Sequence, residues 1–300
     1  MKSDFQIKVE TSLARCFMKF FQLLPHRTAQ LIGGILGVIF HDLVGIRRKA
    51  AIQQLLAAFP ERSERWAKMT VRELYRHLGM HLAEVARIPI MTLKEIERWI
   101  LIEGKEALDR ATSGDHGCLG ISAHWGAWEY NGVWAASHGY KVTYVVAKQA
   151  NPEIEELVDN CRRSVGIQII KRENATREVI KALKANCILT LMLDQDGGEA
   201  GVFVPFFNRL ASTFRGAAVF ALKMDLPIVL VTNRRLHDGR VVVKCELIEF
   251  TASGDRNRDV YELTAKVTAM LEEKIRKRPD EWLWLHRRWK TRPKEETMNC

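Results

Sequence analysis

The 300-residue sequence lacks an apolar run long enough for a simple membrane span. A helix that crosses a bilayer needs roughly 20 predominantly apolar residues, whereas Leu31–Phe40 is followed at once by His41 and Asp42. The apolar stretch before it carries Lys19 and closes at Pro25. The pattern of a secretory signal peptide, a charged start with an apolar run and a small-residue cleavage site, is also missing. These absences argue against a full span in this region.

Basic residues flank the same apolar pieces. Lys19, Arg27 and the run Arg47–Lys49 stand beside them, as expected for helices that lie on an anionic membrane surface. We therefore expect an N-terminal membrane-associating extension. A helical hairpin packed on the protein core would have the same periodicity, so this alternative stays open.

The sequence has no CxxC pair and no cluster of histidines at metal-ligand spacing. Its six cysteines are dispersed, at positions 16, 118, 161, 187, 245 and 300. Scattered cysteines favour reduced thiols in a cytoplasmic setting and argue against a zinc site. We expect neither a metal nor a cofactor.

Acidic residues are scarce at both ends of the chain. Met1–Ala50 has eight Lys and Arg against three Asp and Glu, and Lys274–Lys294 has nine against two. The formal net charge is +10. This distribution indicates an anionic partner, for which lipid headgroups, an acidic protein and nucleic acid are the candidates.

The spacing of apolar residues divides the chain into two parts. Up to about residue 110, apolar side chains recur every three to four positions, which predicts helices over 48–59, 65–88 and 93–100. From Gly117, short apolar runs alternate with helical stretches, which is typical of an α/β layer with a largely parallel sheet. We expect one continuous domain, with a helical region over 1–110 and an α/β core over 111–300. The expected strands are 118–123, 141–147, 167–170, 187–193, 227–232 and 240–248; the expected helices of the core are 127–138, 152–164, 175–185, 215–224 and 258–278, with a long loop after residue 193.

The stretch HWGAWEY places His124 directly after an expected strand and Glu129 five positions later. Ligand sites of parallel α/β sheets cluster at the carboxyl ends of strands. The two side chains can meet only if His124 lies in the turn before a helix with Glu129 one turn inside it, and Gly126 permits such a turn. The imidazole would then be a general base held by the carboxylate. A partly buried histidine among tryptophans beside an exposed glutamate is the competing interpretation, and spacing alone favours it.

Two further segments carry charged or polar side chains that suit a site. Asp194 and Gln195 follow another expected strand, so Asp194 is predicted at the same sheet edge as His124, although an Asp- and Gly-rich turn is the simpler explanation. Two acidic residues without a nearby histidine are only weak evidence for a metal site there. Near the C-terminus, Arg287 and Arg288 stand among tryptophans, a combination that suits phosphate binding at a membrane interface. No nucleic-acid-binding module accompanies it, so we expect no nucleic-acid partner; a solvated basic tail is the alternative.

Taken in order, these segments resemble the lipid A biosynthesis acyltransferase family, late acyltransferases that share an HX4D/E motif with glycerol-phosphate acyltransferases. The resemblance runs from about Phe17 to Pro293. It rests on GISAHWGAWE, NPEIEELVDNCRRSVG, LDQDGG with the following GVFVPFFNRLASTFRGAAVFALKMDLPIVLV, and LHRRWKTRP.

By position, the resemblance implies that His124 and Glu129 are the catalytic pair. In the family pattern a glycine follows the paired phenylalanines. Here Asn208 stands at that position, so the sequence departs from the pattern at the expected turn. The substrate-binding residues that the resemblance implies are Arg162 (with Arg163 adjacent), Asp194, Gln195, Phe206, Phe207, Thr213, Arg287 and Arg288.

The resemblance also implies a reaction. His124 would deprotonate a hydroxyl of a glycolipid acceptor, and the alkoxide would attack the thioester of an acyl-acyl carrier protein or acyl-CoA without an acyl-enzyme. Glu129 would hold the imidazolium, and Arg162 or a helix N-terminus near residue 126 would stabilise the oxyanion. The expected location is the cytoplasmic face of the inner membrane. A thioesterase or hydrolase using the same pair, an acyltransferase for another glycolipid or lysophospholipid, and a non-catalytic membrane-surface protein remain alternatives.

Overall fold

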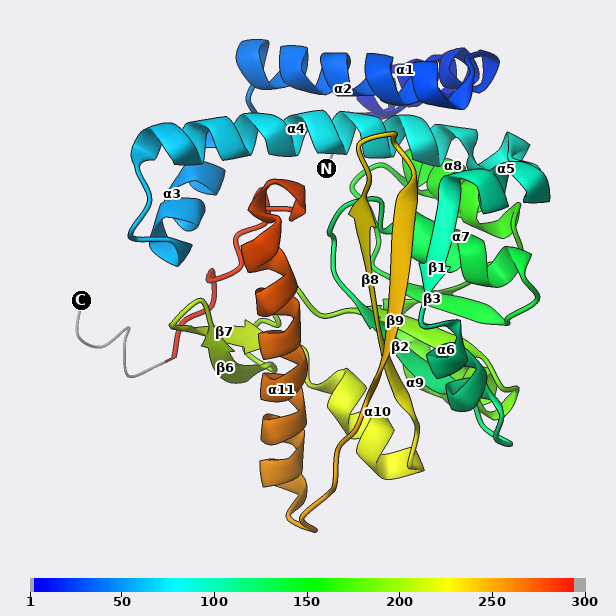
Figure 1. Ribbon diagram of the computed structural model, residues 1–300, viewed down its shortest axis with the longest axis vertical. Helices are drawn as coiled ribbons and strands as arrows, with labels where there is room; N and C mark the ends of the chain where they lie inside the picture. The colour runs from blue at the N-terminus through cyan, green and yellow to red at the C-terminus, as the bar shows by residue number, and fades with distance from the viewer. Residues whose placement is uncertain (1–2, 294–300) are drawn as a thin grey trace.

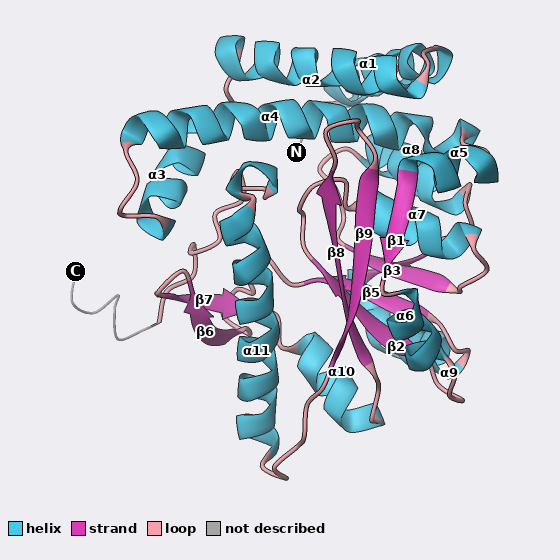
Figure 2. Ribbon diagram, viewed as in Figure 1, coloured by secondary structure: helices cyan, strands magenta, loops and turns pink. Residues whose placement is uncertain are grey.

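A seven-stranded sheet forms the centre of the protein. The structure is a computed structural model that describes residues 3–293, except the side chain of Asn174; Lys294 and Cys300 lie outside the described residues. The strand order is β1-β9-β8-β2-β5-β3-β4. Only β8 and β9 pair antiparallel, and every other neighbouring pair in this sheet is parallel. The predicted α/β fold with a largely parallel sheet is confirmed (Figure 2).

The elements follow one another closely along the chain. The strands are β1 (Ile100–Glu103), β2 (Cys118–Ser122), β3 (Val142–Val146), β4 (Gln168–Lys171), β5 (Ile188–Met192), β6 (Val202–Phe206), β7 (Arg209–Thr213), β8 (Ile228–Arg235) and β9 (Val241–Ile248). The α-helices are α1 (Asp4–Leu23), α2 (His26–Leu43), α3 (Arg48–Ala58), α4 (Glu64–Arg87), α5 (Leu93–Trp99), α6 (Lys105–Thr112), α7 (Glu129–Ser137), α8 (Pro152–Arg163), α9 (Ala175–Lys184), α10 (Gly216–Met224) and α11 (Arg256–Lys277). Short 3-10 turns are η1 (Ile88–Ile90), η2 (Arg172–Asn174) and η3 (Pro279–Glu281).

Helix α4 connects the N-terminal helices to the sheet. Figure 1 shows α1 and α2 as an outer layer across α4, which itself lies across one end of the sheet. Gln30 of α2 donates to the Glu84 carboxylate of α4 (2.7 Å), and Arg235 of β8 donates to the other oxygen (2.8 Å). All three side chains are buried. The N-terminal layer is therefore joined to the sheet by a buried polar network as well as by apolar packing.

Glycines let α2 and α4 approach closely. A Cβ atom on Gly79 would lie 2.1 Å from the carbonyl oxygen of Gly33, and one on Gly37 would lie 2.0 Å from that of Tyr75. Any larger side chain would force the two helices apart.

Three elements were not predicted from the sequence. Strand β1 lies inside the region expected to be wholly helical, and it pairs with β9; its apolar residues extend the helical pattern of α5, so periodicity did not separate the two. Helix α6 was also missed. The third is the hairpin of β6 and β7, expected as loop: Phe207 (φ 50°) and Asn208 (φ 57°) form its tip. Asparagine tolerates this left-handed conformation, so the turn forms with Asn208 at the position where glycine was expected.

No single helix among the described residues is long and apolar enough to cross a membrane. By length and composition alone, the bent pair α2 and α3, with 97° between them, passes the same test.

Candidate active site

The site lies where two neighbouring strands end. Ser122 of β2 is in register with Met192 of β5, and the Leu193 N–H donates to the Ser122 carbonyl (3.1 Å). The chain segments that leave these parallel strands therefore start side by side. His124 stands on one segment and Asp194 on the other, at the edge of the sheet that the sequence predicted for both.

Asp194 holds His124 by two contacts. Its Oδ1 lies 3.0 Å from the imidazole Nδ1, and its Oδ2 accepts the His124 backbone N–H (2.9 Å). The Trp282 indole N–H donates to the same Oδ2 (2.9 Å). Because a carboxylate only accepts hydrogen bonds, Nδ1 carries the proton and Nε2 keeps its lone pair. This arrangement suits a base that removes a proton at Nε2.

Opposing effects set the protonation of this pair. Burial lowers the pKa of His124, but the charge and hydrogen bond of Asp194 outweigh it, so the pKa is raised overall. Burial likewise raises the pKa of Asp194, whereas the facing imidazole and the Trp282 hydrogen bond lower it, with a net decrease. Asp194 is thus an ionised partner that stabilises the imidazolium.

Glu129 does not hold His124, and this part of the prediction was wrong. Glu129 is the first residue of α7 rather than one turn inside it. Its carboxylate instead receives two hydrogen bonds from Arg162, from Nε (3.1 Å) and Nη2 (2.6 Å). The sequence correctly put an acid beside the imidazole but chose the one nearer in the chain, since it could not show which way α7 turns Glu129.

Arg162 belongs to a partly buried chain of alternating charges. Its Nη1 donates to Asp159 (3.0 Å), which also accepts from Lys171 (2.5 Å). Burial raises the pKa of Glu129, but Arg162 reverses this and lowers it overall. Three of the five guanidinium N–H groups are engaged by the two carboxylates, so Arg162 positions Glu129. Arg162 also lines the cavity, and its role as an oxyanion donor stays a prediction.

Two of the amides near residue 126 are engaged within the protein. The Gly126 N–H donates to the Glu281 carbonyl (3.0 Å), and the Ala127 N–H donates to Asn233 Oδ1 (2.9 Å). Gly126 has φ +60°, and a Cβ there would lie 2.3 Å from Asn233 Oδ1. The glycine is required both by the turn and by the close approach of Asn233.

A cavity of about 470 Å³ opens beside His124. Glu129, Arg162 and Gln195 contribute polar groups to its wall. Most of the remaining lining is apolar: Val145, Val146, Ile154, Val158, Val179, Leu189, Leu191, Leu193, Phe214, Ala217 and Phe220. A cavity of this size and lining suits a flexible apolar chain with its reactive group at the polar wall.

The other predicted binding residues have different places. Phe206 and Phe207 are buried in the core. Buried Arg288 donates to Thr213 Oγ1 (2.5 Å) and to the Ser212 carbonyl, so these residues tie the C-terminal segment to β7. Arg287 is exposed and lines a separate shallow pocket. Of the eight predicted binding residues, Arg162, Gln195 and Asp194 lie in or against the site.

Two aromatic contacts of the site were not predicted. Trp282 binds Asp194, as described above. His81 of α4 packs on Trp128 with 3.6 Å between ring centroids, and Trp128 in turn meets His124 edge-on at 5.4 Å. Burial lowers the pKa of His81 to about 4, so it is a neutral ring. Both residues come from distant elements, and no spacing in the sequence links them to His124.

A buried histidine–carboxylate pair beside a largely apolar cavity defines an enzyme site for substrates with long apolar groups. Comparison with known proteins is consistent with this class. A model of the bacterial lipid A biosynthesis acyltransferases matches residues 2–291. The chain is 26% identical over 280 residues to the lipid A biosynthesis palmitoleoyltransferase of Escherichia coli K12, covering 91% of this chain and 89% of that protein. It is 28% identical over 278 residues to the lauroyltransferase of the same organism, covering 90% and 88%.

A mycobacterial relative is named for a different acceptor. The chain is 26% identical over 220 residues to a phosphatidylinositol mannoside acyltransferase of Mycobacterium tuberculosis, covering 70% of this chain and 67% of that protein.

The protein belongs to the bacterial lipid A biosynthesis acyltransferase family. It is therefore an O-acyltransferase, which uses an acyl donor and a glycolipid acceptor.

Proposed function

We propose that this protein transfers a fatty acyl chain from an acyl thioester to a hydroxyl of a lipid A precursor, with His124 as general base. The supporting observation is the His124–Asp194 pair, which leaves Nε2 as a proton acceptor at the wall of a largely apolar cavity. General base catalysis of this kind contributes about 10²- to 10⁴-fold to the rate.

The steps balance without a covalent enzyme intermediate. His124 Nε2 takes the acceptor hydroxyl proton as the oxygen attacks the thioester carbonyl carbon. The tetrahedral intermediate then collapses, the C–S bond breaks, and the imidazolium returns the proton to the leaving thiolate. Ser122 is an unsuitable nucleophile because it is 1% exposed inside β2 and its hydroxyl accepts from Asn131 (3.1 Å).

The acyl chain is proposed to occupy the apolar part of the cavity. Ala217 and Phe220 of α10 and Val179 of α9 contribute to this part. Gln195 follows Asp194 directly and lines the same cavity. Its side-chain amide is a candidate for the donor to the developing oxyanion, beside the remaining N–H groups of Arg162 in the same cavity wall.

We place the enzyme on the cytoplasmic face of the inner membrane. Most of the exposed large apolar side chains lie between Phe5 and Ile46, on α1, α2 and the turn after α2. Exposed Lys8 and Lys19 lie on α1, and exposed Lys49 lies in the first turn of α3; all three suit anionic headgroups. The cavity is close to this layer, because Asn151, at the start of α8, donates to the Ile7 carbonyl of α1 (3.3 Å). A lipid acceptor would thus reach His124 from the membrane surface.

The donor is proposed to be an acyl-acyl carrier protein. Acyl carrier protein is acidic, and the formal charge of +10 favours its encounter with this enzyme. An acyl-CoA would serve the same chemistry, so the test compares the two donors.

Product mass distinguishes these proposals. Detergent-purified full-length protein is supplied with lauroyl- or myristoyl-acyl carrier protein, or the matching acyl-CoA, and a Kdo-bearing tetraacyl lipid A precursor. The expected result is a mass gain of one acyl chain, faster with the carrier-protein donor. Release of free fatty acid alone would instead make the protein a thioesterase. Acylation of a phosphatidylinositol mannoside or lysophospholipid but not of the precursor would overturn the proposed acceptor.

A further inference from the structure

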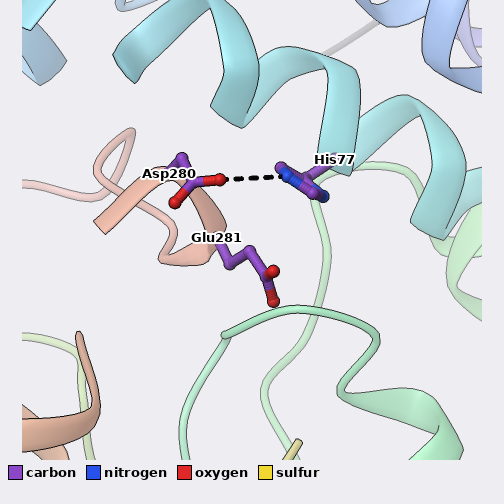
Figure 3. Close-up of side chains that lie close together, drawn as sticks. All are labelled: His77, Asp280 and Glu281. Carbon is purple, nitrogen blue, oxygen red and sulfur yellow. Dashed lines mark hydrogen bonds and ion pairs between the residues drawn. The ribbon is translucent and has the colours of Figure 1, made fainter. Parts of the chain in front are cut away.

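A second group of titratable side chains lies between α4 and the C-terminal segment. It consists of His77 on α4 with Asp280 and Glu281 on η3 (Figure 3). One potential ligand atom from each of the three residues lies within 4.8 Å of the others. The function described above uses none of these side chains. Some 200 positions of sequence separate His77 from the two acids, so no motif could indicate the cluster.

The cluster contains buried polar atoms without hydrogen-bond partners. His77 is 5% exposed and Glu281 1% exposed. His77 Nε2 contacts Asp280 Oδ2 at 3.2 Å, but its Nδ1 has no partner among the described residues. Glu281 Oε2 has no hydrogen-bond partner in the described part of the chain, and Glu281 Oε1 has only an ion-pair contact with Arg278. Such groups are costly to bury unless something not yet considered satisfies them.

The charges of the cluster are also poorly balanced. Two carboxylates face one imidazole in a buried space. Arg278 makes ion-pair contacts with both carboxylates, with Glu281 Oε1 at 2.5 Å and with Asp280 Oδ1 at 3.6 Å. Its single charge offsets only one of the two, and its side chain is 41% exposed, so solvent screens it. A bound divalent cation would neutralise both carboxylates and use the free lone pairs of Glu281.

We propose that His77, Asp280 and Glu281 form a binding site for a first-row divalent cation, for which Zn²⁺ is the best fit. One imidazole and two carboxylates are a ligand set that zinc accepts, at about 2.0–2.2 Å for each bond. In a tetrahedral site the ligand atoms lie about 3.5 Å apart, so the side-chain torsions of Asp280 and Glu281 must draw the atoms together. Asp280, with 27% of its side chain exposed, provides the route to solvent and leaves room for a water as fourth ligand.

The cation would clamp the segment that supports the active-site loop. Directly after the cluster, the Trp282 indole binds Asp194 and the Leu283 N–H donates to the His124 carbonyl (3.0 Å). The Glu281 carbonyl itself accepts the Gly126 N–H. Fixing η3 on α4 therefore fixes the backbone at His124 and directly after it. The role is structural, and removing the cation should lower stability before it alters the chemistry.

Metal content and melting temperature test the site directly. Full-length protein in detergent, with its thiols alkylated so that cysteine cannot bind metal, is equilibrated with Zn²⁺ and freed of unbound ion. We expect about one Zn²⁺ per chain and a rise in melting temperature of at least about 2 °C. His77→Ala and Glu281→Gln should each reduce the affinity at least tenfold and abolish the rise. His237→Ala is the matched control, because it removes an exposed histidine beside Asp238.

A spectroscopic measurement covers the case in which the variants do not fold. Wild-type protein loaded with Co²⁺ should show the visible d–d absorption of a low-coordinate site, and added Zn²⁺ should remove it. The proposal is overturned if the folded wild-type protein binds neither Zn²⁺ nor Co²⁺. It is equally overturned if His77→Ala and Glu281→Gln bind the metal as well as His237→Ala does.

Discussion

At the residue scale, the reactivity of His124 depends on one buried carboxylate. Asp194 orients the ring through Nδ1, fixes the backbone through the His124 N–H, and raises the imidazole pKa. Replacing Asp194 by asparagine removes the carboxylate charge but keeps the shape of the side chain. The result of this substitution is therefore not caused by loss of packing.

Asp194→Asn should lower kcat by about 10²- to 10⁴-fold, because the amide no longer favours the tautomer with the proton on Nδ1. The sign of the pH effect also follows. His124 must be neutral to act as a base, and Asp194 raises the pKa of His124. The residual rate of the variant should therefore reach its plateau at a lower pH than the wild-type rate does. A pH–rate profile checks this, and an unmoved acid limb would contradict the pairing.

Glu129→Gln is expected to act differently. It leaves the buried Arg162 guanidinium short of a charge partner, so the free energy of unfolding should fall by about 3 kcal/mol, with a loss of turnover. The acid limb of the pH–rate profile should move less than in Asp194→Asn, because Glu129 does not contact His124. Glu156→Gln breaks an exposed pair with Arg163 and is the control, with little expected effect. A profile that moved as far as in Asp194→Asn would restore Glu129 as the partner of His124.

Sequence reasoning located these residues but misassigned their contacts. The strand-end rule put His124 and Asp194 at one edge of the sheet, which the structure bears out. The partnership of Glu129 with Arg162 could not be predicted, because it depends on how α7 and α8 pack. The burial of Arg288 against Thr213 is a similar case, since basic residues usually remain exposed.

At the scale of elements, the crossing of α2 and α4 depends on three glycines. Gly79→Val should reduce the free energy of unfolding by about 3 kcal/mol, because its side chain would overlap the backbone of α2. Denaturant unfolding measures this. A Cβ on Gly114 would meet nothing within 4 Å, so Gly114→Ala is the control, with a change near zero. Equal stability of the two variants would show that the helices are not closely packed.

The cavity lining should determine the acyl chain that the enzyme accepts. Ala217 is a small residue of α10 on the apolar wall. Ala217→Phe would fill part of the cavity, so kcat/KM for the longer of two acyl donors should fall at least tenfold more than for the shorter. Competition between lauroyl and myristoyl donors provides the measurement. A uniform fall for both chains would place the acyl group elsewhere.

The elements differ in how readily the sequence reveals them. Strands such as β2 and β5 and the long helix α4 have clear apolar patterns and were predicted close to their observed bounds. The β6–β7 hairpin was not, because its turn uses Phe207 and Asn208 instead of the usual Asn-Gly or Gly-rich pair. Strand β1 has four residues and follows α5 without a break.

At the scale of the whole molecule, the exposed apolar side chains are concentrated on α1 and α2. Leu23, Leu31 and Leu43 are 85%, 64% and 81% exposed. Changing all three to Asp should lower partitioning onto anionic vesicles more than tenfold, because each apolar side chain buried in the interface contributes about 1.5 kcal/mol or more. Unfolding midpoints should change little.

The control for this prediction replaces exposed apolar residues on other elements. Leu210 and Tyr261 lie on β7 and α11. Leu210→Asp with Tyr261→Asp should bind vesicles as the wild type does. If the triple variant retained wild-type binding, the proposed membrane surface would be wrong.

The central claim is that His124, held by Asp194, is the base of acyl transfer. Its most direct test is a single-turnover reaction of wild-type and His124→Ala protein with acyl-acyl carrier protein and the lipid A precursor, with mass detection of the lipid product. The account predicts one added acyl chain in the wild-type product and a rate at least about 100-fold lower in a folded His124→Ala variant. Equal rates of product formation in the two proteins would contradict it.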